Sequence, residues 1–312
     1  MILLTGASGH IGKRMAQRFL RDGIDFIGID MVDNLALPEY RFKKMDVRDS
    51  SIADLIEKSG VHSIIHLAFC TKPKMDPKTR DDIDLNGSKN IAACAATKGV
   101  KNIVFASSGR VYGDQHSEGG IKDIDDNYLN PLDDTYAQNK IKAEHIFLKA
   151  ADDHGIKLAI LRLAIVCWRG GGAGMGDMFK ATSKTGRFFT LGKKNPLIQL
   201  VHVDDVINGC LNAIGKEGIF DIASEGTMPL VDIFREAAKL GGKKPAHIRL
   251  PEKLTVSTVS LFWKLGICPV PPLYLKMLGY DITRDLSKTI DKLGKPIYTI
   301  QQILKVIVEA SS

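Results

Sequence analysis

Cysteine is scarce in this chain. Of the 312 residues, five are cysteines, at positions 70, 94, 167, 210 and 268, and none belongs to a CxxC motif. An odd number of widely spaced cysteines fits neither a disulfide framework nor a zinc site. We therefore expect buried, reduced thiols in a reducing compartment and no bound metal.

Targeting signals and long apolar runs are also lacking. Residues 1–5, MILLT, read as a strand and carry neither the basic segment nor the long apolar core of a signal peptide. The most apolar late stretch, residues 254–267, is interrupted by Lys264 and is too short to span a bilayer. These absences predict a cytoplasmic protein without a membrane partner.

Arginine-rich runs are missing, and basic residues do not alternate with aromatic ones. The net charge is nevertheless +7, with 43 lysines and arginines against 36 acidic residues. A basic surface attracts small phosphorylated molecules as readily as nucleic acid. We expect a small, anionic substrate and no nucleic-acid partner.

Short apolar runs alternate with amphipathic stretches over the first two thirds of the chain. The apolar runs predict strands at 1–5, 26–30, 63–67, 102–106, 157–163 and 197–203. Helical patterns lie between them at 12–22, 51–59, 81–98, 134–154 and 206–214. This alternation predicts an α/β protein with a doubly wound parallel sheet.

A glycine-rich turn follows the first predicted strand and opens the first helix. Gly6 permits a tight turn, Gly9 lets the backbone approach a pyrophosphate, and Gly12 lets helix and strand pack closely. The helix N-terminus would then face the phosphates. Asp30 ends the second strand, where a carboxylate can accept both ribose hydroxyls and repel a 2′-phosphate, which favours NAD over NADP. The alternative is an ordinary turn residue.

A tyrosine and a lysine share one face of a later helix. Tyr136 and Lys140 are four residues apart, about thirty residues after Ser107 and Ser108. A phenol titrates near ~10, too high for a base at neutral pH. A neighbouring ammonium would lower that pKa towards the working range. We predict that Tyr136 moves a proton and that Lys140 assists it.

These three motifs, in this order and spacing, resemble the extended short-chain dehydrogenase/reductase family, which includes the NAD-dependent epimerases and dehydratases. The resemblance covers nearly the whole chain and implies a Rossmann-type NAD-binding domain. It implies catalytic roles for Ser108, Tyr136 and Lys140, with Ser107 the alternative serine by one position. The implied cofactor-binding residues are Gly6, Ser8, Gly9, His10, Ile11, Gly12, Asp30, Asp46, Val47, Leu67, Ala68, Tyr136 and Lys140.

The resemblance also implies a division of the chain and a homodimer. The NAD-binding domain would comprise residues 1–166, with 195–216 returning to it. A smaller substrate-binding lobe would comprise mainly 167–194 and 217–312, with the last helix, 299–310, packing on the body. In this family the helices at 81–98 and 134–154 form the contact between subunits.

Several further residues match the family without a settled role. Asn86 either bridges helix and active site or takes part in catalysis. Arg162 and His202 are interpreted as structural, and Asp204 or Asp205 is expected to cap the helix that follows.

The chain departs from the family pattern at the expected substrate site. Nucleotide-sugar enzymes often carry an arginine shortly before the His-Val-Asp-Asp motif, where this chain has Gln199. Cations that could replace it lie on loops: Lys72, Lys74, Arg169, Lys193 and Lys194. The glycine-rich loop at 170–176 could close over a substrate.

Three functions are therefore compared. The leading one is an NAD-dependent epimerase or dehydratase acting on a sugar or nucleotide sugar. Dehydration is the less supported of the two, because Gly109 and Arg110 follow Ser108 where dehydratases have an acidic pair. The second is a simple NAD-dependent alcohol dehydrogenase or ketone reductase. The third, a non-catalytic dinucleotide sensor, is disfavoured because Tyr136 and Lys140 are both present.

Overall fold

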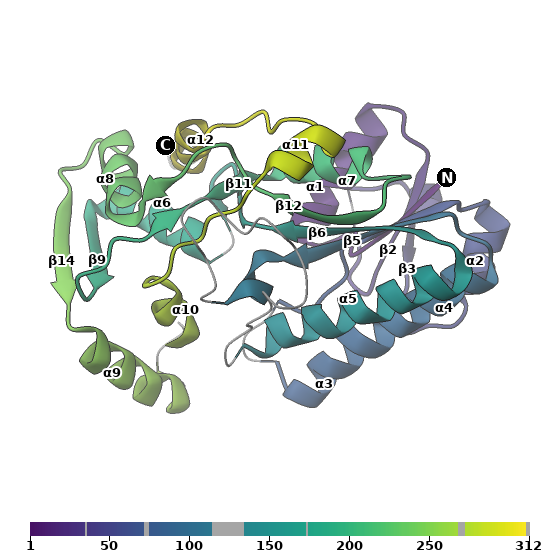
Figure 1. Cartoon of the computed structure of the whole chain (residues 1–312), viewed down its shortest axis with the longest axis horizontal. Coiled ribbons are helices and arrows are strands. Elements are labelled where there is room, and N and C mark those ends of the chain that lie inside the picture. Colours follow the sequence, from purple (N-terminus) through teal and green to yellow (C-terminus); the bar gives the residue numbers. More distant parts are fainter. Residues whose placement is uncertain (35, 72–74, 114–133, 173, 268–271, 310–312) are drawn as a thin grey trace.

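A seven-stranded parallel sheet forms the centre of the molecule (Figure 1). The computed structural model describes residues 1–312 except 35, 72–74, 114–133, 173, 268–271 and 310–312. The strand order is β12-β6-β5-β4-β1-β2-β3. The order reverses between β1 and β4, and ligands of such sheets bind at the carboxyl ends of the strands at this point. This confirms the predicted Rossmann-type doubly wound fold.

The sheet strands are short and, apart from the edge strand β3, mostly buried, as strands covered on both faces should be. They are β1 (Ile2–Thr5), β2 (Phe26–Asp30), β3 (Phe42–Lys44), β4 (Ser63–His66), β5 (Asn102–Ser108), β6 (Lys157–Leu163) and β12 (Gly218–Ile222). Thr5 lies level with Ile29 on one side and His66 on the other. The glycine-rich turn therefore leaves the sheet at the point where the strand order reverses.

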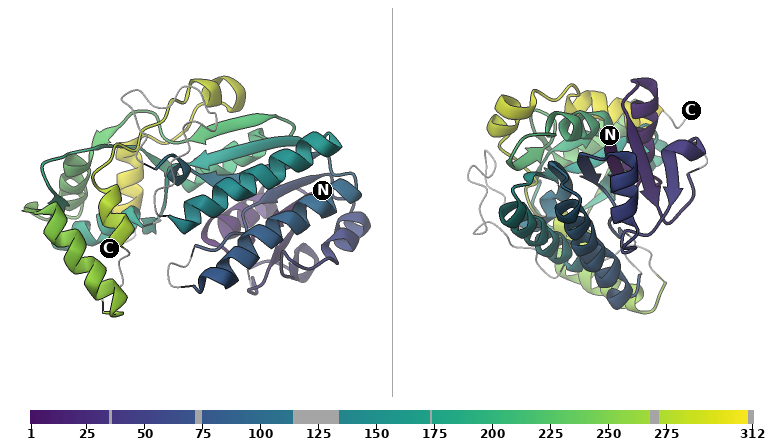
Figure 2. Two further views of the ribbon diagram at one scale, coloured as in Figure 1. Left: turned by 60° about the horizontal axis from the view of Figure 1, so that its bottom comes forward. Right: turned by 90° about the vertical axis from the view of Figure 1, so that its right-hand side faces the viewer.

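Helices cover both faces of the sheet (Figures 1 and 2). One face carries α1 (His10–Arg21), α7 (Val203–Asn212) and α11 (Ser287–Leu293), whose apolar residues share one core with β1 and β6. The other carries α2 (Ile52–Ser59), α4 (Gly87–Thr97) and α5 (Thr135–His154). A short helix, α3 (Pro77–Asp81), and a π-helical turn, η2 (Asp82–Asn86), lead into α4. Two 3-10 turns, η1 (Glu39–Arg41) and η3 (Gly109–Tyr112), complete this part.

Residues 197–203 were predicted as the sixth strand of the central sheet. They do contain strands, but these strands lie outside that sheet. That stretch forms β10 (Leu197–Ile198) and β11 (Leu200–His202), which pair with β13 (Met228–Pro229) and β7 (Ile165–Trp168) in small separate sheets. The outer sheet position belongs to β12, which pairs in parallel with β6. Residues 218–222 therefore lie in the large domain, although the predicted division placed 217–312 mainly in the smaller lobe. The apolar content of residues 197–203 and of β12 did not show which of the two belongs to the central sheet.

The smaller lobe has a core of its own. It contains α6 (Met175–Thr185), β9 (Arg187–Leu191), α8 (Leu230–Leu240), β14 (Ala246–Leu250), α9 (Glu252–Lys264), α10 (Pro272–Met277) and α12 (Ile300–Glu309). The last helix, α12, buries Ile303, Leu304 and Ile307 in this core and contacts α6 and α8. We expected this helix to pack on the body. Its apolar face instead packs in the core of the smaller lobe.

The glycine-rich stretch at 169–176 is more ordered than a loop. Gly171 and Gly172 form β8, which pairs antiparallel with β7, and α6 already begins at Met175. A Cβ atom on Gly172 would lie 2.8 Å from the Gly176 Cα, so the glycines allow close backbone packing. Residue 173 lies outside the described residues.

Two expectations from the absences can be compared with the structure. Cys70, Cys94, Cys167 and Cys210 are free and buried, as predicted, while Cys268 lies outside the described residues. Among the described residues, none of the helices is both long and apolar enough to cross a bilayer.

Candidate active site

The turn between β1 and α1 is shaped by backbone contacts that only glycine permits. Gly6 has a φ of +70°, and a Cβ atom there would lie 2.7 Å from the Ala68 backbone nitrogen. A Cβ on Gly12 would lie 2.0 Å from the Gly6 carbonyl oxygen. The first glycine therefore makes the turn and the third lets the helix approach the strand, as predicted.

The N-terminus of α1 has free hydrogen-bond donors. Its N-cap is Gly9, which has no side chain to satisfy the first backbone N–H groups, and the first turn carries no acidic residue. Unpaired N–H groups and the positive end of the helix dipole suit a pyrophosphate. The residues present here therefore fit a dinucleotide.

Asp30 lies beside this turn at the end of β2. Its carboxylate accepts hydrogen bonds from the backbone N–H of Ser8 and of Val32, both at 3.0 Å. The Ser8 hydroxyl donates to the Val32 carbonyl at 2.6 Å. These bonds hold a carboxylate where the adenosine ribose of a dinucleotide would lie, and a 2′-phosphate would be repelled there.

An aromatic stack that the sequence analysis missed closes the outer side of the turn. The His10 ring stacks on Trp168 at 4.8 Å between ring centroids, with an interplanar angle of 14°. The Arg14 guanidinium lies 5.1 Å from the Trp168 ring centroid and donates to the His10 carbonyl. Trp168 ends β7, so the end of this strand lies beside the glycine-rich turn.

The other predicted cofactor residues differ in their contacts. The Asp46 carboxylate is bound by Arg48, which also contacts Asp82, and this pairing holds the pKa of Asp46 below its usual range. Val47 is buried against Gly87. Leu67 and Ala68 follow β4 opposite Gly6, where the Ala68 N–H donates to the Thr5 hydroxyl at 3.2 Å. Arg48 was not among the predicted site residues. The only sequence signal for it is its position directly after Asp46 and Val47.

Ser108 and Tyr136 are brought together from different elements. Ser108 is the last residue of β5, and its hydroxyl is one of the groups that oppose the rise of the Tyr136 pKa. It also accepts from the Arg110 backbone N–H at 3.2 Å. Ser107, the alternative by one position, points elsewhere and binds Glu144. The structure therefore favours Ser108 over Ser107 as the serine beside the phenol.

The pKa of Tyr136 is not lowered by the protein alone. Burial raises it to about 12, and the opposing groups are the Arg110 guanidinium and the Ser108 hydroxyl. The Lys140 ammonium donates to the Ala106 carbonyl at 2.6 Å and lies 5.8 Å from the Tyr136 ring centroid. That Lys140 lowers the Tyr136 pKa stays a prediction.

Arg110 is a site residue that the motif did not reveal. Its guanidinium lies 4.8 Å from the Tyr136 ring centroid and 5.4 Å from that of Tyr274. Asp134 accepts from it at 2.6 Å and also caps α5 through the Tyr136 backbone N–H. One carboxylate thus fixes both the cation and the helix that carries the tyrosine.

Lys140 is buried below the tyrosine. Its ammonium lies 3.6 Å from the Phe69 ring centroid, a cation–π contact. Burial lowers its pKa to about 7, while Asp84 and Glu144 oppose that shift. Burial therefore disfavours the charged form of this lysine relative to an exposed one.

Asp84, not Asn86, connects the preceding helix to the site. Asn86 is exposed and donates to Asp82 at 2.7 Å. Asp84 is buried, accepts from the Cys70 N–H at 2.7 Å and receives a second bond from Asn139. The π-helical turn sets this register, and no sequence pattern announced it.

A buried charged network lies behind Ser108. Arg162 binds Glu144 at 2.6 Å and donates to the Tyr112 hydroxyl, which confirms its structural interpretation. Asp221 on β12 accepts from Tyr112 and is paired with Arg284. Arg284 donates in turn to the Gly109 carbonyl. The turn after Ser108 is thereby tied to the C-terminal part of the chain.

Gln199 serves this network and does not face a ligand. It is buried, donates to the Ser224 carbonyl and accepts from the Arg284 backbone N–H. Of the cations proposed to replace the missing arginine, Arg169, Lys193 and Lys194 are exposed, and Lys72 and Lys74 lie outside the described residues.

His202 is structural, as interpreted. Its ring stacks on Tyr298 at 3.8 Å, and its Nδ1 accepts from the Asp204 N–H. His202 itself therefore caps α7, which corrects the expectation that Asp204 or Asp205 does so. Asp205 instead accepts from the Ile297 and Tyr298 backbone N–H groups.

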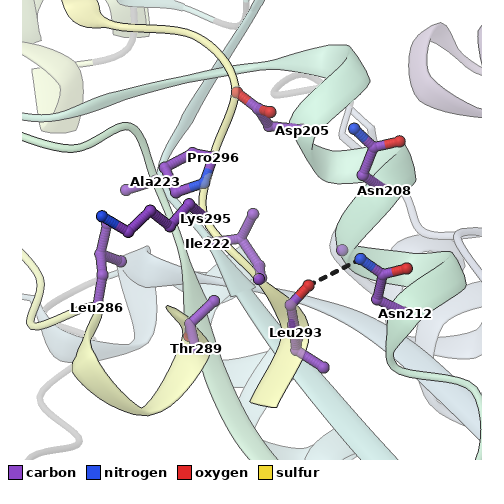
Figure 3. A pocket seen from close by; sticks show the side chains of 12 residues that line it. Asp205, Asn208, Asn212, Ile222, Ala223, Leu286, Thr289, Leu293, Lys295 and Pro296 are labelled. Carbon is purple, nitrogen blue, oxygen red and sulfur yellow. Dashed lines mark hydrogen bonds between the residues drawn. The ribbon is translucent and has the colours of Figure 1, made fainter. Parts of the chain in front are cut away.

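A pocket elsewhere is too small for the expected substrate. It lies between α7, β12 and α11, and its lining includes Asp205, Ile222, Thr289 and Leu293 (Figure 3). Its volume is about 30 Å³, roughly the space of a water molecule, against the several hundred cubic ångströms of ligand sites. None of its lining residues is among the predicted site residues, so we place the site at the β1–α1 crevice.

Taken together, a dinucleotide-type turn and a Ser–Tyr–Lys group at the carboxyl edge of the sheet define an oxidoreductase-type site. The model of the NAD dependent epimerase/dehydratase family matches residues 2–223, and the chain belongs to this family. It is an NAD-dependent enzyme of the extended short-chain dehydrogenase/reductase type, as the resemblance implied.

Individual relatives agree with this assignment. A putative UDP-glucose 4-epimerase of Methanocaldococcus jannaschii is 28% identical over 249 residues, covering 75% of this chain and 80% of that protein. The N-acetyl-alpha-D-glucosaminyl-diphospho-ditrans,octacis-undecaprenol 4-epimerase of Escherichia coli is 25% identical over 263 residues, covering 81% and 76%. The crystal structure of a Thermotoga maritima UDP-glucose 4-epimerase with UDP-glucose has a TM-score of 0.78 at 20% identity, covering 99% and 98%.

Proposed function

We propose that this protein is an epimerase that inverts a hydroxyl-bearing carbon of a sugar carried on a diphosphate. The observation that carries the proposal is the glycine-built turn between β1 and α1, whose close backbone contacts and uncapped helix N-terminus fit a dinucleotide beside the Asp30 carboxylate. The named relatives act on UDP-glucose or on a polyprenol diphosphate sugar, which supports this substrate class.

The chain's own residues would divide the work as follows. Tyr136 would take the proton of the reacting hydroxyl, and Ser108 would hold its oxygen as charge shifts. Gly6, Gly9 and the N-terminus of α1 would bind the pyrophosphate, and Asp30 the ribose. Bound NAD supplies the hydride acceptor and donor. Burial raises the pKa of Tyr136 to about 12 and so disfavours its phenolate. Arg110 and Ser108 oppose this effect and would favour the phenolate.

Epimerisation is supported over dehydration by the residues after Ser108. Gly109 lies against Arg284, where a Cβ would be 2.0 Å from a guanidinium nitrogen, and Arg110 places a cation beside Tyr136. The nearby carboxylate of Asp134 is paired with Arg110. An acid–base pair for removing water is therefore not assembled by these residues.

A second candidate is a simple NAD-dependent dehydrogenase acting on a non-nucleotide alcohol. The observation that favours it is Gln199, which is buried and committed to backbone groups where a diphosphate-binding arginine was expected. For either function, we propose that the smaller lobe binds the substrate, since Tyr274 of α10 reaches Arg110.

The test begins with the dinucleotide. We expect freshly purified protein to retain NAD through dialysis, seen by native mass spectrometry, and to interconvert sugar nucleotides without net NAD turnover. An empty protein that consumes added NAD with simple alcohols would replace the epimerase by the dehydrogenase.

The Tyr136→Phe variant tests the catalytic role. It should lower turnover by roughly three orders of magnitude, while NAD content stays near that of the parent protein. Turnover is followed by separating the two sugar epimers, and NAD by its release on denaturation. Equal loss of NAD would assign Tyr136 to binding instead.

A further inference from the structure

Helix α9 carries an apolar stripe that the protein does not cover. Leu254 and Leu265 are 67% and 62% exposed, and Leu261 and Phe262 are also exposed. At 3.6 residues per turn these four side chains share one side of the helix. The opposite side, with Val256 and Val259, packs on the smaller lobe. The helix therefore has apolar residues on both sides: one side packs on the lobe, and the other faces solvent.

Positive charge surrounds this stripe. Lys253 and Lys264 flank it on the same helix and are exposed. Residues 239–276 contain seven lysines and arginines and a single acidic residue, Glu252, so this segment holds +6 of the chain's net charge of +7. It runs from the end of α8 through β14 and α9 to α10, along the outer end of the smaller lobe (Figures 1 and 2).

We propose that α9 docks this enzyme onto the surface of an anionic lipid bilayer. Apolar side chains beside lysines are what an interfacial helix presents: the former enter the boundary of the acyl chains, and the latter meet the headgroups. Nucleic acid would match the charge but not the leucines. The helix would lie on the surface and not cross it, which revises our expectation of no membrane partner. It agrees with the finding that, within the part of the chain that the structure describes, no helix could span a bilayer.

The position of α9 gives the docking a consequence for catalysis. The helix packs against α10, and Tyr274 of α10 lies 5.4 Å from the Arg110 guanidinium, which in turn lies over Tyr136. The lipid surface would thus lie on the side of the lobe that adjoins the catalytic group. A substrate held at the bilayer would reach the site without leaving the surface.

The experiment is co-sedimentation of the full chain with vesicles. We expect binding to phosphatidylcholine vesicles that contain phosphatidylglycerol, and much weaker binding to phosphatidylcholine alone. Leu261→Gln combined with Leu265→Gln should weaken binding at least roughly tenfold. Lys253→Gln and Lys264→Gln should each cost about fivefold, less at high salt.

A matched control is Ile297→Gln. Ile297 is 66% exposed but lies outside α9, so its replacement should leave vesicle binding unchanged. Equal binding to both vesicle types, or unchanged binding by the double leucine variant, would overturn the proposal. The proposal would also be overturned if the double leucine variant had a different sedimentation mass from the parent protein in the absence of vesicles. The stripe would then be a contact with a second copy of the chain.

Failure here is separable from failure of the proposed function. NAD content and turnover of a water-soluble sugar nucleotide are measured without vesicles, and both should be the same in the double leucine variant as in the parent protein. Loss of either in that variant would mean that α9 supports the active site and would overturn a role confined to docking.

Discussion

Around Tyr136, the residues divide between those that carry charge and those that hold position. Arg110 places its guanidinium over the phenol, whereas Lys140 turns its ammonium to a backbone carbonyl and two aromatic rings. The spacing of a tyrosine and a lysine on one helix face therefore brings the side chains near each other. It does not determine which cation acts on the phenol.

The buried ammonium of Lys140 leads to a pH-dependent stability. Its pKa is 10.5 when unperturbed and about 7 in the folded chain. Between these values the unfolded chain binds a proton that the folded chain has lost, so this residue makes stability rise with pH. Each pH unit contributes at most about 1.4 kcal/mol. Lys140→Met should remove this rise in urea unfolding between about pH 7 and about pH 9.

The control for this prediction lies on the same helix. Lys149 is 78% exposed and pairs with Asp153, so Lys149→Met should leave the pH dependence as it is in the parent protein. Parallel pH profiles for the parent and Lys140→Met would show that the ammonium is solvated or otherwise paired in solution.

Among the elements, α5 is tied to the sheet by charge as well as by apolar packing. Glu144 meets Arg162 of β6 and Ser107 of β5, all three buried. The same helix presents Tyr136 and Lys140 to the site. Its position, and with it the position of Tyr136 and Lys140, depends on a polar network inside the molecule.

Removing one partner of this network should be costly. Glu144→Ala leaves the Arg162 guanidinium buried without its counter-ion, and we expect a loss of about 3–5 kcal/mol in the free energy of unfolding. Asp153→Ala removes an exposed pair of the same helix and should cost less than about 1 kcal/mol. Urea denaturation of both variants compares them, and similar losses would contradict the burial of the pair.

For the whole molecule, α4 and α5 lie side by side on one face of the sheet (Figure 2). This is the face through which the family resemblance implies a homodimer. Leu148 of α5 is 40% exposed, so it is available for contact with a second subunit.

A charged substitution on this face tests the dimer. Leu148→Glu should convert a dimer to a monomer in sedimentation velocity, because it would bury a carboxylate between apolar surfaces. Leu20→Glu on α1 is matched, with 37% exposure on the other face, and should leave the mass unchanged. A parent protein that sediments as a monomer would remove the prediction altogether.

The sequence by itself determined the features that depend on local order along the chain. Gly6, Gly9 and Gly12 between a strand and a helix announced the dinucleotide-type turn, because the turn and the close packing are local backbone requirements. The alternation of apolar runs and amphipathic helices likewise determined the parallel sheet. Tyr136 and Lys140 were found because four residues make one turn of helix.

Only the tertiary structure decided the features that depend on residues far apart. Arg110 could not be assigned to the site until Asp134 and Tyr274 were placed beside it. Asp84 replaced Asn86 because a π-helical turn changes the register of the helix. The membership of β12 in the central sheet rests on pairing with β6, which joins positions about 60 residues apart in sequence. Such contacts are set by packing and burial, and these leave no local pattern in the chain.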